Sequence, residues 1–428
     1  MSLPENVDVV GVGFGPSNLS LAIALEEHPV NGSGEPIAAR FFERLPAFSW
    51  HRHMLLPSAT MQVAFLKDLA TFRNPVSRFS FVSYLHATNR LVQFVNNKSF
   101  FPTRQEFHKY LEWAESSVSD QVSYGTEVTA MRLRSPDRIE LVSRSATGGV
   151  QAVTASNVVI STGLVPRMPA GIERDDRVWH SSEFLDQYAR QDPSELKTVA
   201  VVGAGQSAAE ITRFLYDSLP HAQVYAILPS YGYSVADDTP FANQVFDPAA
   251  VDEYYFGTDQ TRDAFWRYHS NTNYSVVDDE VIRELYRRTY HEDVLNVRRL
   301  HFVNLTKVEE IKRTGNETRA SLKSLLSGAI DLDVDAIVFA TGYHSMEPAR
   351  VLGELDQHCL RDEAGRYRVE RDYRLVTTPE LSCGIYLQGG TEHTHGLTSS
   401  LLSNIAIRSG EIAESIVNSR AGVRAVAY

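Results

Sequence analysis

The sequence predicts an α/β fold in which one strand–glycine turn–helix pattern occurs twice and a smaller lobe is inserted after the second copy. The first copy begins with the apolar run at residues 7–10, and the second begins with the run at residues 198–202. Each run is short and rich in valine, as buried parallel strands are, and each leads through closely spaced glycines into a helical pattern. With 428 residues, the chain is long enough for two or three such lobes.

The first glycine turn directly follows its strand. It reads Gly11-x-Gly13-x-Gly15-Pro16, with Pro16 where a G-x-G-x-x-G fingerprint has its third glycine. Gly11 permits a tight turn, Gly13 lets the backbone approach a pyrophosphate, and Pro16 suits the first turn of a helix whose N-terminus attracts an anion. Glu43 ends the next strand, where a carboxylate can hydrogen-bond a ribose hydroxyl. These features predict a Rossmann-like dinucleotide site.

The second glycine turn reads Gly203-x-Gly205-x-x-Ala208, and the fingerprint allows alanine at its last position. The following strand, at residues 223–228, ends without a carboxylate. That absence removes the repulsion that would reject a 2′-phosphate, which favours NADPH over NADH. No arginine stands at this strand end to hold the phosphate, so the strength of the preference stays open.

Two further strand ends match each other. The apolar runs at residues 157–163 and 335–343 both break at Thr-Gly. Together with two dinucleotide sites, they imply electron transfer from a nicotinamide to a flavin. Cys359 and Cys383 form no C-x-x-C pair, which disfavours disulfide reduction and a cysteine zinc site. Because disulfide reduction is disfavoured, we expect the reduced flavin to activate oxygen.

Composition excludes several other classes. A net charge of -12 argues against a nucleic-acid partner. No signal peptide and no apolar run of transmembrane length is visible, so we expect a cytoplasmic protein without a membrane association. The pairs His51 with His53 and His393 with His395 lack the helical spacing of a zinc pair, and we predict no metal.

The stretch at residues 229–290 is rich in Asn, Asp and aromatic residues, with a helical pattern only from about Asp278. We therefore expect a substrate-binding lobe at residues 229–299. Residues 1–165 and 335–419 are expected to form an FAD-binding domain, and residues 166–228 and 300–334 an NADPH-binding domain.

Several further segments carry a resemblance. They are F-S-W-H at 48–51, M-Q-V-A-F-L-K-D-L at 61–69, G-Q-S-A-A-E at 205–210, T-P-F-A-N-Q-V-F at 239–246, N-T-N-Y at 271–274, D-x3-F-A-T-G-Y-x4-P at 335–348, G-T-E-H-T-H-G-L at 390–397 and S-L-L-S at 400–403. In these segments, and from about residue 7 to about residue 415, the chain resembles the N-hydroxylating flavin monooxygenases of siderophore biosynthesis, the L-ornithine N5- and L-lysine N6-monooxygenase family.

The resemblance implies FAD and NADPH as cofactors, with L-ornithine and O2 as substrates. By position, Lys67 binds the substrate α-carboxylate, as a lysine point charge can, while Asn243 and Asn273 hydrogen-bond the amino acid. Ser403 supplies a hydroxyl on the substrate side. Gln62 lies beside the flavin and Asn273 also faces the nicotinamide ribose, so these two are the catalytic candidates.

The same resemblance assigns residues to each cofactor. Those assigned to FAD are Gly11, Gly13, Gly15, Pro16, Glu43, Trp50, His51, Gln62, Val128, Ser400, Leu401 and Leu402. Those assigned to NADPH are Gly203, Gly205, Gln206, Ser207, Ala208, Asn273, Thr341 and Gly342.

The implied reaction is hydroxylation of the ornithine side-chain amine by a C4a-hydroperoxyflavin, giving N5-hydroxy-L-ornithine, NADP+ and water for siderophore or related natural-product biosynthesis. Ornithine is favoured over lysine because the segments at 240–243 and 271–274 look closer to the ornithine branch. L-lysine or a diamine as substrate, a flavin monooxygenase acting on a sulfide or ketone, and a non-catalytic flavoprotein stay open. The family often forms tetramers, which implies a homo-oligomer.

Overall fold

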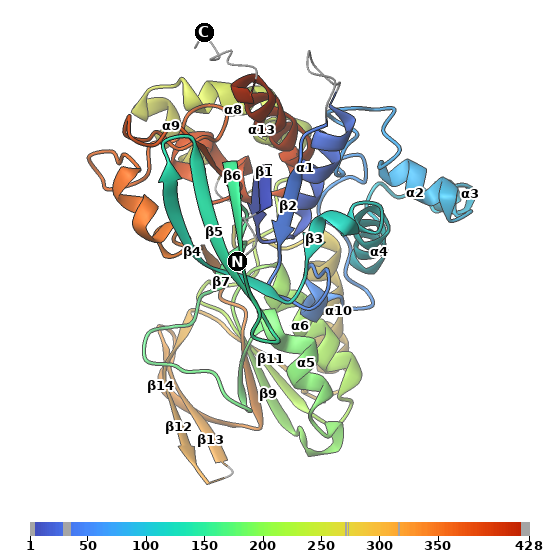
Figure 1. The fold of residues 1–428 in the computed structure, drawn as a ribbon. Coiled ribbons are helices and arrows are strands. Elements are labelled where there is room, and N and C mark those ends of the chain that lie inside the picture. The colour runs from blue at the N-terminus through green and yellow to red at the C-terminus, as the bar shows by residue number, and fades with distance from the viewer. Residues whose placement is uncertain (1–4, 29–35, 270–271, 273, 316, 421–428) are drawn as a thin grey trace.

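The computed structural model describes residues 5–28, 36–269, 272, 274–315 and 317–420. Two β-sheets organise the chain, and Figure 1 shows the sheet that contains β1 above the sheet that contains β9. Each sheet contains the strand of one of the two predicted strand–turn–helix patterns. The predicted α/β class is confirmed.

The first sheet has seven strands, of which five are parallel and two form an antiparallel hairpin at one edge. Its order is β3-β2-β1-β6-β5-β4, and β17 also pairs with β6. The bounds are β1 Glu5–Val12, β2 Ala39–Phe42, β3 Val122–Ser123, β4 Thr126–Ser135, β5 Arg138–Ser145, β6 Val150–Ile160 and β17 Gly384–Leu387. Helices α1 (Pro16–Glu27) and α13 (Ile405–Arg420) pack together on one face, in a core that includes Val9, Leu21 and Ile412.

The second sheet has five parallel strands in the order β11-β10-β9-β15-β8. Successive side chains of β9 point to opposite faces of this sheet. Val199 and Val201 pack toward helix α6, whereas Ala200 and Val202 pack toward a three-stranded antiparallel sheet formed by β12, β13 and β14. The bounds are β8 Val178–His180, β9 Thr198–Val202, β10 Gln223–Ile227, β11 Leu300–Val303, β15 Ala336–Phe339, α5 Phe184–Ala189, α6 Gln206–Ser218, α10 Asp279–Val294, β12 Thr306–Thr314, β13 Glu317–Ser324 and β14 Gly328–Val334.

The chain crosses between the two sheets twice, side by side. Strands β7 (Leu164–Pro166) and β16 (Tyr343–Ser345) pair antiparallel at this crossing. The predicted boundary at residue 335 is therefore wrong. Strand β15 pairs with β9 and β8, and the Asp335 carboxylate accepts the backbone N–H groups of the residues that open β9, so the boundary falls after β15.

The inserted segment at residues 229–299 is more helical than predicted. Three helices precede α10: α7 (Pro240–Asn243), α8 (Pro248–Tyr255) and α9 (Asp259–His269). The expectation of a helix only from Asp278 failed because α7 and α8 are short helices opened by proline, without a long apolar repeat. The segment is also divided. We call the seven-stranded sheet with its helices the first unit and the five-stranded sheet with its helices the second unit. Helix α8 packs against the first unit at residues 392–400, whereas α10 buries Val281 and Leu285 in the core of the second unit.

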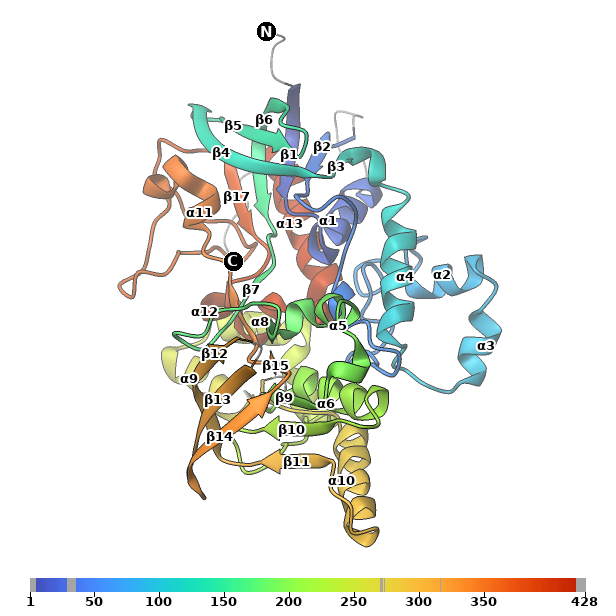
Figure 2. The same cartoon turned by 90° about the horizontal axis from the view of Figure 1, so that it is seen from below.

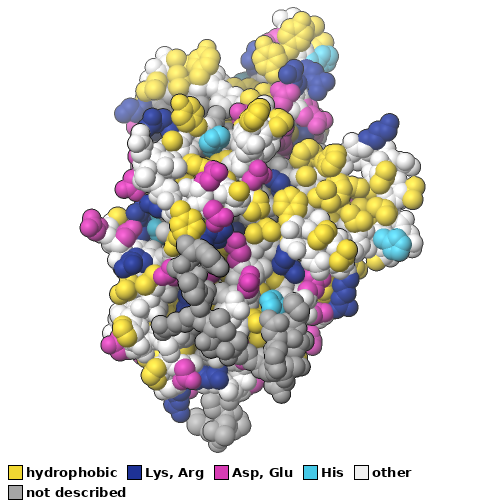
Figure 3. Space-filling view, turned by 90° about the horizontal axis from the view of Figure 1, so that it is seen from above, with side chains coloured by type: hydrophobic (Ala, Val, Ile, Leu, Met, Phe, Trp, Pro, Cys, Tyr) yellow, Lys and Arg dark blue, Asp and Glu magenta, His cyan; other side chains and the backbone are white. Residues whose placement is uncertain are grey.

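The remaining helices surround the first unit. They are α2 Phe81–Ala87, α3 Leu91–Asn96, α4 Arg104–Glu115, α11 Ala349–Leu352 and α12 Glu392–His395, with 3-10 turns η8 Gly396–Ser400 and η9 Leu402–Asn404. Figure 2 shows α2 and α3 projecting as an arm beside α4. Hydrophobic side chains gather on that side in Figure 3. Within the described residues, no helix is both long and apolar enough to span a membrane.

Candidate functional site

The first glycine turn joins β1 to α1. Gly13 has a φ of +84°, and a Cβ built there would overlap the carbonyl oxygen of Ser161. A Cβ on Gly11 would overlap the ring of Phe41. Both glycines are therefore required by the packing of the turn itself.

Gly15 is different, because a Cβ built on it would meet nothing within 4 Å. It caps α1 without a side-chain hydrogen bond, Pro16 follows at the start of the helix, and the first turn holds no acidic residue. The N–H groups of this turn are thus left for an anion, and the glycine leaves room for it to approach. This arrangement fits the pyrophosphate of a dinucleotide.

The carboxylate of Glu43 is fixed against this turn. Its Oε2 accepts the backbone N–H of Phe14 at 2.7 Å, and its Oε1 accepts that of Leu45 at 2.8 Å. Each carboxylate oxygen keeps a further lone pair. Glu43 is therefore held at the end of β2 with acceptor capacity for a ribose hydroxyl.

The second glycine turn joins β9 to α6. Gly203 has a φ of +142°, and a Cβ there would overlap the carbonyl oxygen of Ala340 and crowd Ala208. Gly205 caps α6 without a side-chain hydrogen bond and with no acidic residue in the first turn, as Gly15 does for α1. A Cβ on Gly205 would lie 3.7 Å from the Cα of Ser275, which brings the loop before α10 beside this turn. This turn fits a second dinucleotide.

The two predicted amide residues meet through a carboxylate. Gln62 donates from Nε2 to Oδ1 of Asp278 at 3.2 Å, and Gln206 donates from Nε2 to Oδ2 of Asp278 at 2.8 Å. The structure thus connects a residue predicted for the flavin with one predicted for NADPH. Of the other NADPH candidates, Ser207 is half-buried on α6. Asn273 lies outside the described residues.

Thr341 and Gly342 lie where the chain leaves the second sheet. The Thr341 hydroxyl donates to the carbonyl of Arg167, and the Arg167 side chain donates back to the Thr341 carbonyl at 2.9 Å. The Nε2 of His180 is 3.0 Å from the carbonyl oxygen of Gly342. Burial lowers the pKa of His180 to about 4, so near neutral pH its neutral ring donates from Nε2 to this carbonyl. These contacts fix the crossing, and a role of Thr341 toward NADPH stays a prediction.

Lys67 faces the inserted segment. Its Nζ lies 5.8 Å from the centroid of the Phe246 ring, and burial lowers the pKa of Lys67 although nearby Asp247 raises it. Asn243 precedes Phe246 by three residues and donates from Nδ2 to the carbonyl of Asp238 at 2.7 Å. The structure therefore brings Lys67 to the segment that carries Asn243, as a substrate site requires.

Asp68, which the sequence analysis missed, holds the loop that carries Lys67. Its buried carboxylate accepts N–H groups from Ala70, Thr71 and Phe81 at 2.9, 2.6 and 2.7 Å. Burial raises the pKa of Asp68, and these hydrogen bonds lower it. An acid that follows the lysine directly inside an apolar run was the available signal.

The 3-10 turns η8 and η9, which precede α13, lie at the residues predicted to contact FAD and the substrate, Ser400, Leu401, Leu402 and Ser403. Ser400 donates to Oε1 of Glu392 at 2.9 Å, and the Tyr274 hydroxyl donates to the same oxygen at 3.3 Å. Leu401 packs against a cluster formed by Val245, Phe246 and Leu397, whereas Leu402 packs against the core of the first unit. Ser403 is buried. The turn therefore touches both the first unit and the inserted segment.

Arg408 was also missed by the sequence analysis. It is buried in α13 and donates to the carbonyls of Thr398 and Ser399 at 3.2 and 2.8 Å. Because a buried guanidinium must be hydrogen-bonded, these contacts fix the turn that precedes the helix. A single arginine within the apolar pattern of this helix was the signal.

Three predicted FAD residues have less definite surroundings. Trp50 packs on Phe107 with ring centroids 5.8 Å apart. His51 has a φ of 49°, and burial, followed by Arg104 and His108, lowers its pKa to about 4. Val128 packs on the face of the first sheet opposite α1, so its assignment rests on the resemblance alone.

The second histidine pair contacts backbone carbonyls. His393 lies 2.8 Å from the carbonyl of Tyr367, and His395 lies 3.1 Å from that of Arg371. Among the described residues, no group of three or more His, Cys, Asp or Glu is placed to hold a metal ion. Both cysteines are buried and unpaired, and burial raises their pKa values to about 12 for Cys359 and about 11 for Cys383.

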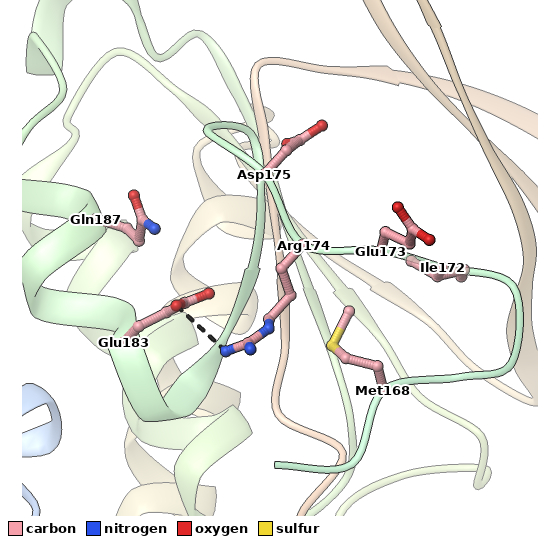
Figure 4. Close-up of a pocket in the computed structure, with 7 residues that line it drawn as sticks. All are labelled: Met168, Ile172, Glu173, Arg174, Asp175, Glu183 and Gln187. Carbon is pink, nitrogen blue, oxygen red and sulfur yellow. Dashed lines mark hydrogen bonds and ion pairs between the residues drawn. The ribbon is translucent and has the colours of Figure 1, made fainter.

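A separate surface pocket lies beside α5 and contains none of the predicted residues. Its volume is about 480 Å³, and Figure 4 shows Arg174 reaching Glu183, with which it forms an ion pair at 3.3 Å. The residues that line it are Met168, Ile172, Glu173, Arg174, Asp175, Glu183 and Gln187.

Comparison with known proteins identifies the family of the chain. Residues 5–345 match the family described as L-lysine 6-monooxygenase/L-ornithine 5-monooxygenase. The L-ornithine N(5)-monooxygenase of Pseudomonas aeruginosa is 37% identical over 420 residues, covering 96% of this chain and 93% of that protein.

Two solved structures extend the comparison. The ornithine N-hydroxylase of Kutzneria sp. 744, in a structure with reduced FAD, NADP+ and L-ornithine, is 61% identical with a TM-score of 0.94, covering 97% of this chain and 100% of that one. The L-lysine 6-monooxygenase of Pseudomonas syringae is 28% identical with a TM-score of 0.82, covering 96% and 99%. The chain belongs to the L-lysine 6-monooxygenase/L-ornithine 5-monooxygenase family.

Proposed function

We propose that the protein is an FAD- and NADPH-dependent monooxygenase that hydroxylates N5 of L-ornithine with O2. The observation that carries the proposal is the pair of uncapped glycine turns, together with the Asp278 carboxylate that joins Gln62, the residue predicted for the flavin, to Gln206 at the second turn. This arrangement suits hydride transfer between two dinucleotides. The greater identity to an ornithine N-hydroxylase, 61% against 28% for a lysine enzyme, supports ornithine as the substrate.

The chain's own residues would bind and orient the substrate. Lys67 carries the positive charge that an α-carboxylate needs, and Asn243 keeps its amide oxygen as an acceptor for a substrate N–H group. The flavin, when bound and reduced by NADPH, supplies the activation of oxygen.

The substrate amine is the nucleophile toward the activated oxygen, so it must first lose its proton. An alkylamine has a pKa of about 10.4 in water, and apolar surroundings favour its neutral form. Phe246, Leu397 and Leu401 provide such surroundings near Lys67, and burial lowers the pKa of Lys67 itself. With the α-carboxylate at Lys67, a side-chain amine that lay against the rest of this cluster, Leu397 or Leu401, would have its pKa lowered in the same way.

Lysine differs from ornithine by one methylene, a difference that enzymes convert into about 1–3 kcal/mol. A diamine would leave Lys67 without a carboxylate partner. Both substrates are therefore disfavoured, the diamine by charge and lysine by length.

The test measures NADPH oxidation and hydroxylamine formation together, on FAD-loaded protein with L-ornithine, L-lysine and putrescine. We expect hydroxylated product from ornithine with a kcat/KM at least about tenfold above that for lysine. NADPH oxidation that yields peroxide without hydroxylamine would preserve the flavin assignment and overturn the substrate.

We also propose that the protein assembles as a homo-oligomer, a tetramer. The arm formed by α2 and α3 exposes Val92 at 73% and Val95 at 63%, and the segment after α3 exposes Phe100 at 60%. An apolar surface of this kind favours a protein partner. Light scattering after size exclusion should give four chains. The variant Val92→Asp/Val95→Asp should lower that mass, and a monomeric parent protein would contradict the proposal.

A further inference from the structure

Asp278 precedes α10 and links the loop that carries Gln62 to the second glycine turn. Its carboxylate uses one oxygen for each amide: Oδ1 accepts from Gln62 at 3.2 Å, and Oδ2 accepts from Gln206 at 2.8 Å. Its backbone N–H donates to Oε1 of Gln206 at 2.9 Å. Asp278 therefore contacts residues that lie 216 and 72 positions away in the chain.

The contacts leave little freedom to the Gln206 amide. Both of its ends are bound to Asp278, and its Nε2 also donates to Oε1 of Glu210 at 3.0 Å. Gln206 is the first residue of α6, directly after Gly205. Its orientation therefore sets what the start of this helix presents to a dinucleotide.

Gln62 is oriented by the same carboxylate. Because its Nε2 is bound to Asp278, the carbonyl half of its amide is presented as an acceptor. If Asp278 offered a donor at this position, the Gln62 amide would turn over and present its N–H groups instead.

The network continues into the first unit through a charged pair. Glu210 accepts both terminal nitrogens of Arg104 at 2.9 Å each, and Arg104 also donates to the carbonyl of Met54 at 2.8 Å. The network contains two carboxylates, Asp278 and Glu210, but one guanidinium, Arg104, so its ionised side chains carry one net negative charge. Burial and Glu210 both raise the pKa of Asp278, whereas the two amides and Arg104 lower it.

We propose that Asp278 is a positioning residue that couples NADP+ binding at the second turn to the flavin side of the site, by holding the amides of Gln62 and Gln206 in one hydrogen-bond network. The inference rests on the proposed assignment of FAD to the first turn and NADPH to the second. Asp278 acts through the two amides and needs no contact with either cofactor.

The test is Asp278→Asn. The carboxamide keeps the size of the side chain but replaces one acceptor oxygen with a donor, so it can accept from only one of the two amides, and the other amide must turn over or lose its hydrogen bond. NADP+ affinity is measured by titrating the oxidised holoenzyme and following the flavin absorption. We expect Kd to rise about tenfold, with the FAD content and the Kd for L-ornithine unchanged. An NADP+ affinity equal to that of the parent protein would overturn the proposal.

Two further variants complete the experiment. Asp279→Asn removes the neighbouring carboxylate, which pairs with Arg283 at the surface, and should leave NADP+ binding unchanged. The exchange Gln62→Glu/Asp278→Asn restores the donor–acceptor match, because the new asparagine donates to the new glutamate and still accepts from Gln206. It should recover most of the NADP+ affinity, and a folded, FAD-loaded exchange variant without recovery would overturn the proposal.

The cofactor assignment is checked separately with Gly203→Val. If this variant binds NADP+ as the parent protein does, the assignment of NADPH to the second turn fails whatever Asp278→Asn does. If it loses NADP+ binding while Asp278→Asn retains it, the inference about Asp278 alone is wrong.

Discussion

Lys67 combines a positive charge with half-burial next to Phe246, a combination that costs free energy unless an anion pairs with it. We expect Lys67→Met to raise the KM for L-ornithine about 10- to 100-fold, because a charge-assisted hydrogen bond contributes about 1.5–3 kcal/mol. FAD content should not change. Steady-state kinetics with varied ornithine measure the effect, and an unchanged KM would point to a substrate without a carboxylate.

The matched control is Lys109→Met, on an exposed face of α4. It removes the same charge from a position in contact with solvent and should leave the KM for ornithine unchanged. If both variants raised the KM equally, the effect would come from net charge rather than from a site at Lys67.

Among the residues, Lys67 and Gln62 could be proposed from the sequence because they lie in recognisable segments, and their roles stay predictions. Asp278 could not, because its partners are brought to it only by the fold. Asp68 and Arg408 carried a signal, a charge within an apolar run, but that signal does not identify the backbone groups that they bind. Asp278 bonds Gln62 from 216 positions away. A single carboxylate or guanidinium has no local pattern that distinguishes such a role from an ordinary solvated charge.

At the scale of elements, the glycine turn before α1 contains one glycine that the fold requires, Gly13, and one that we expect only a ligand to require, Gly15. Gly13→Val should destabilise the protein and abolish FAD binding, because φ is +84° and the side chain would overlap Ser161. Gly15→Ala has open space and should fold normally, yet weaken FAD, because its methyl group occupies the path of the anion. Thermal unfolding and the ratio of flavin to protein absorbance distinguish the two effects.

Gly148→Ala provides a control, since that glycine has a φ of +89° in a hairpin turn remote from α1. It should lower stability without changing the affinity for FAD. Full FAD content in Gly15→Ala would contradict a phosphate contact at this position.

Elements with a strong local pattern were predicted closely. The run predicted at residues 198–202 is strand β9, Thr198–Val202, because its valines and its glycine turn indicate the same structure. Helices α8 and α9 were missed because α8 is short and opens with a proline, and α9 contains no fully buried residue. Their helical form depends on packing against residues 392–400 and on each other, which a local pattern does not reveal.

At the scale of the whole molecule, the two units were predicted but their boundary was misplaced. Strand β15 lies between β9 and β8, so the chain completes the second sheet only after residue 335. A Thr-Gly strand end occurs in both units, and the sequence does not say to which sheet each belongs. The partner strands decide this, and pairing in parallel sheets is non-local.

The two units are joined by the ion pair between Arg104 on α4 and Glu210 on α6, whose side chains are 12% and 1% exposed. Glu210→Leu should destabilise the protein by about 3–5 kcal/mol, because it leaves a buried guanidinium without its carboxylate. Arg104→Met/Glu210→Leu removes both charges and should recover most of that loss. Urea denaturation of the FAD-loaded protein measures both variants. If the double variant were as unstable as the single one, packing around the two side chains, rather than their charges, would hold the units together.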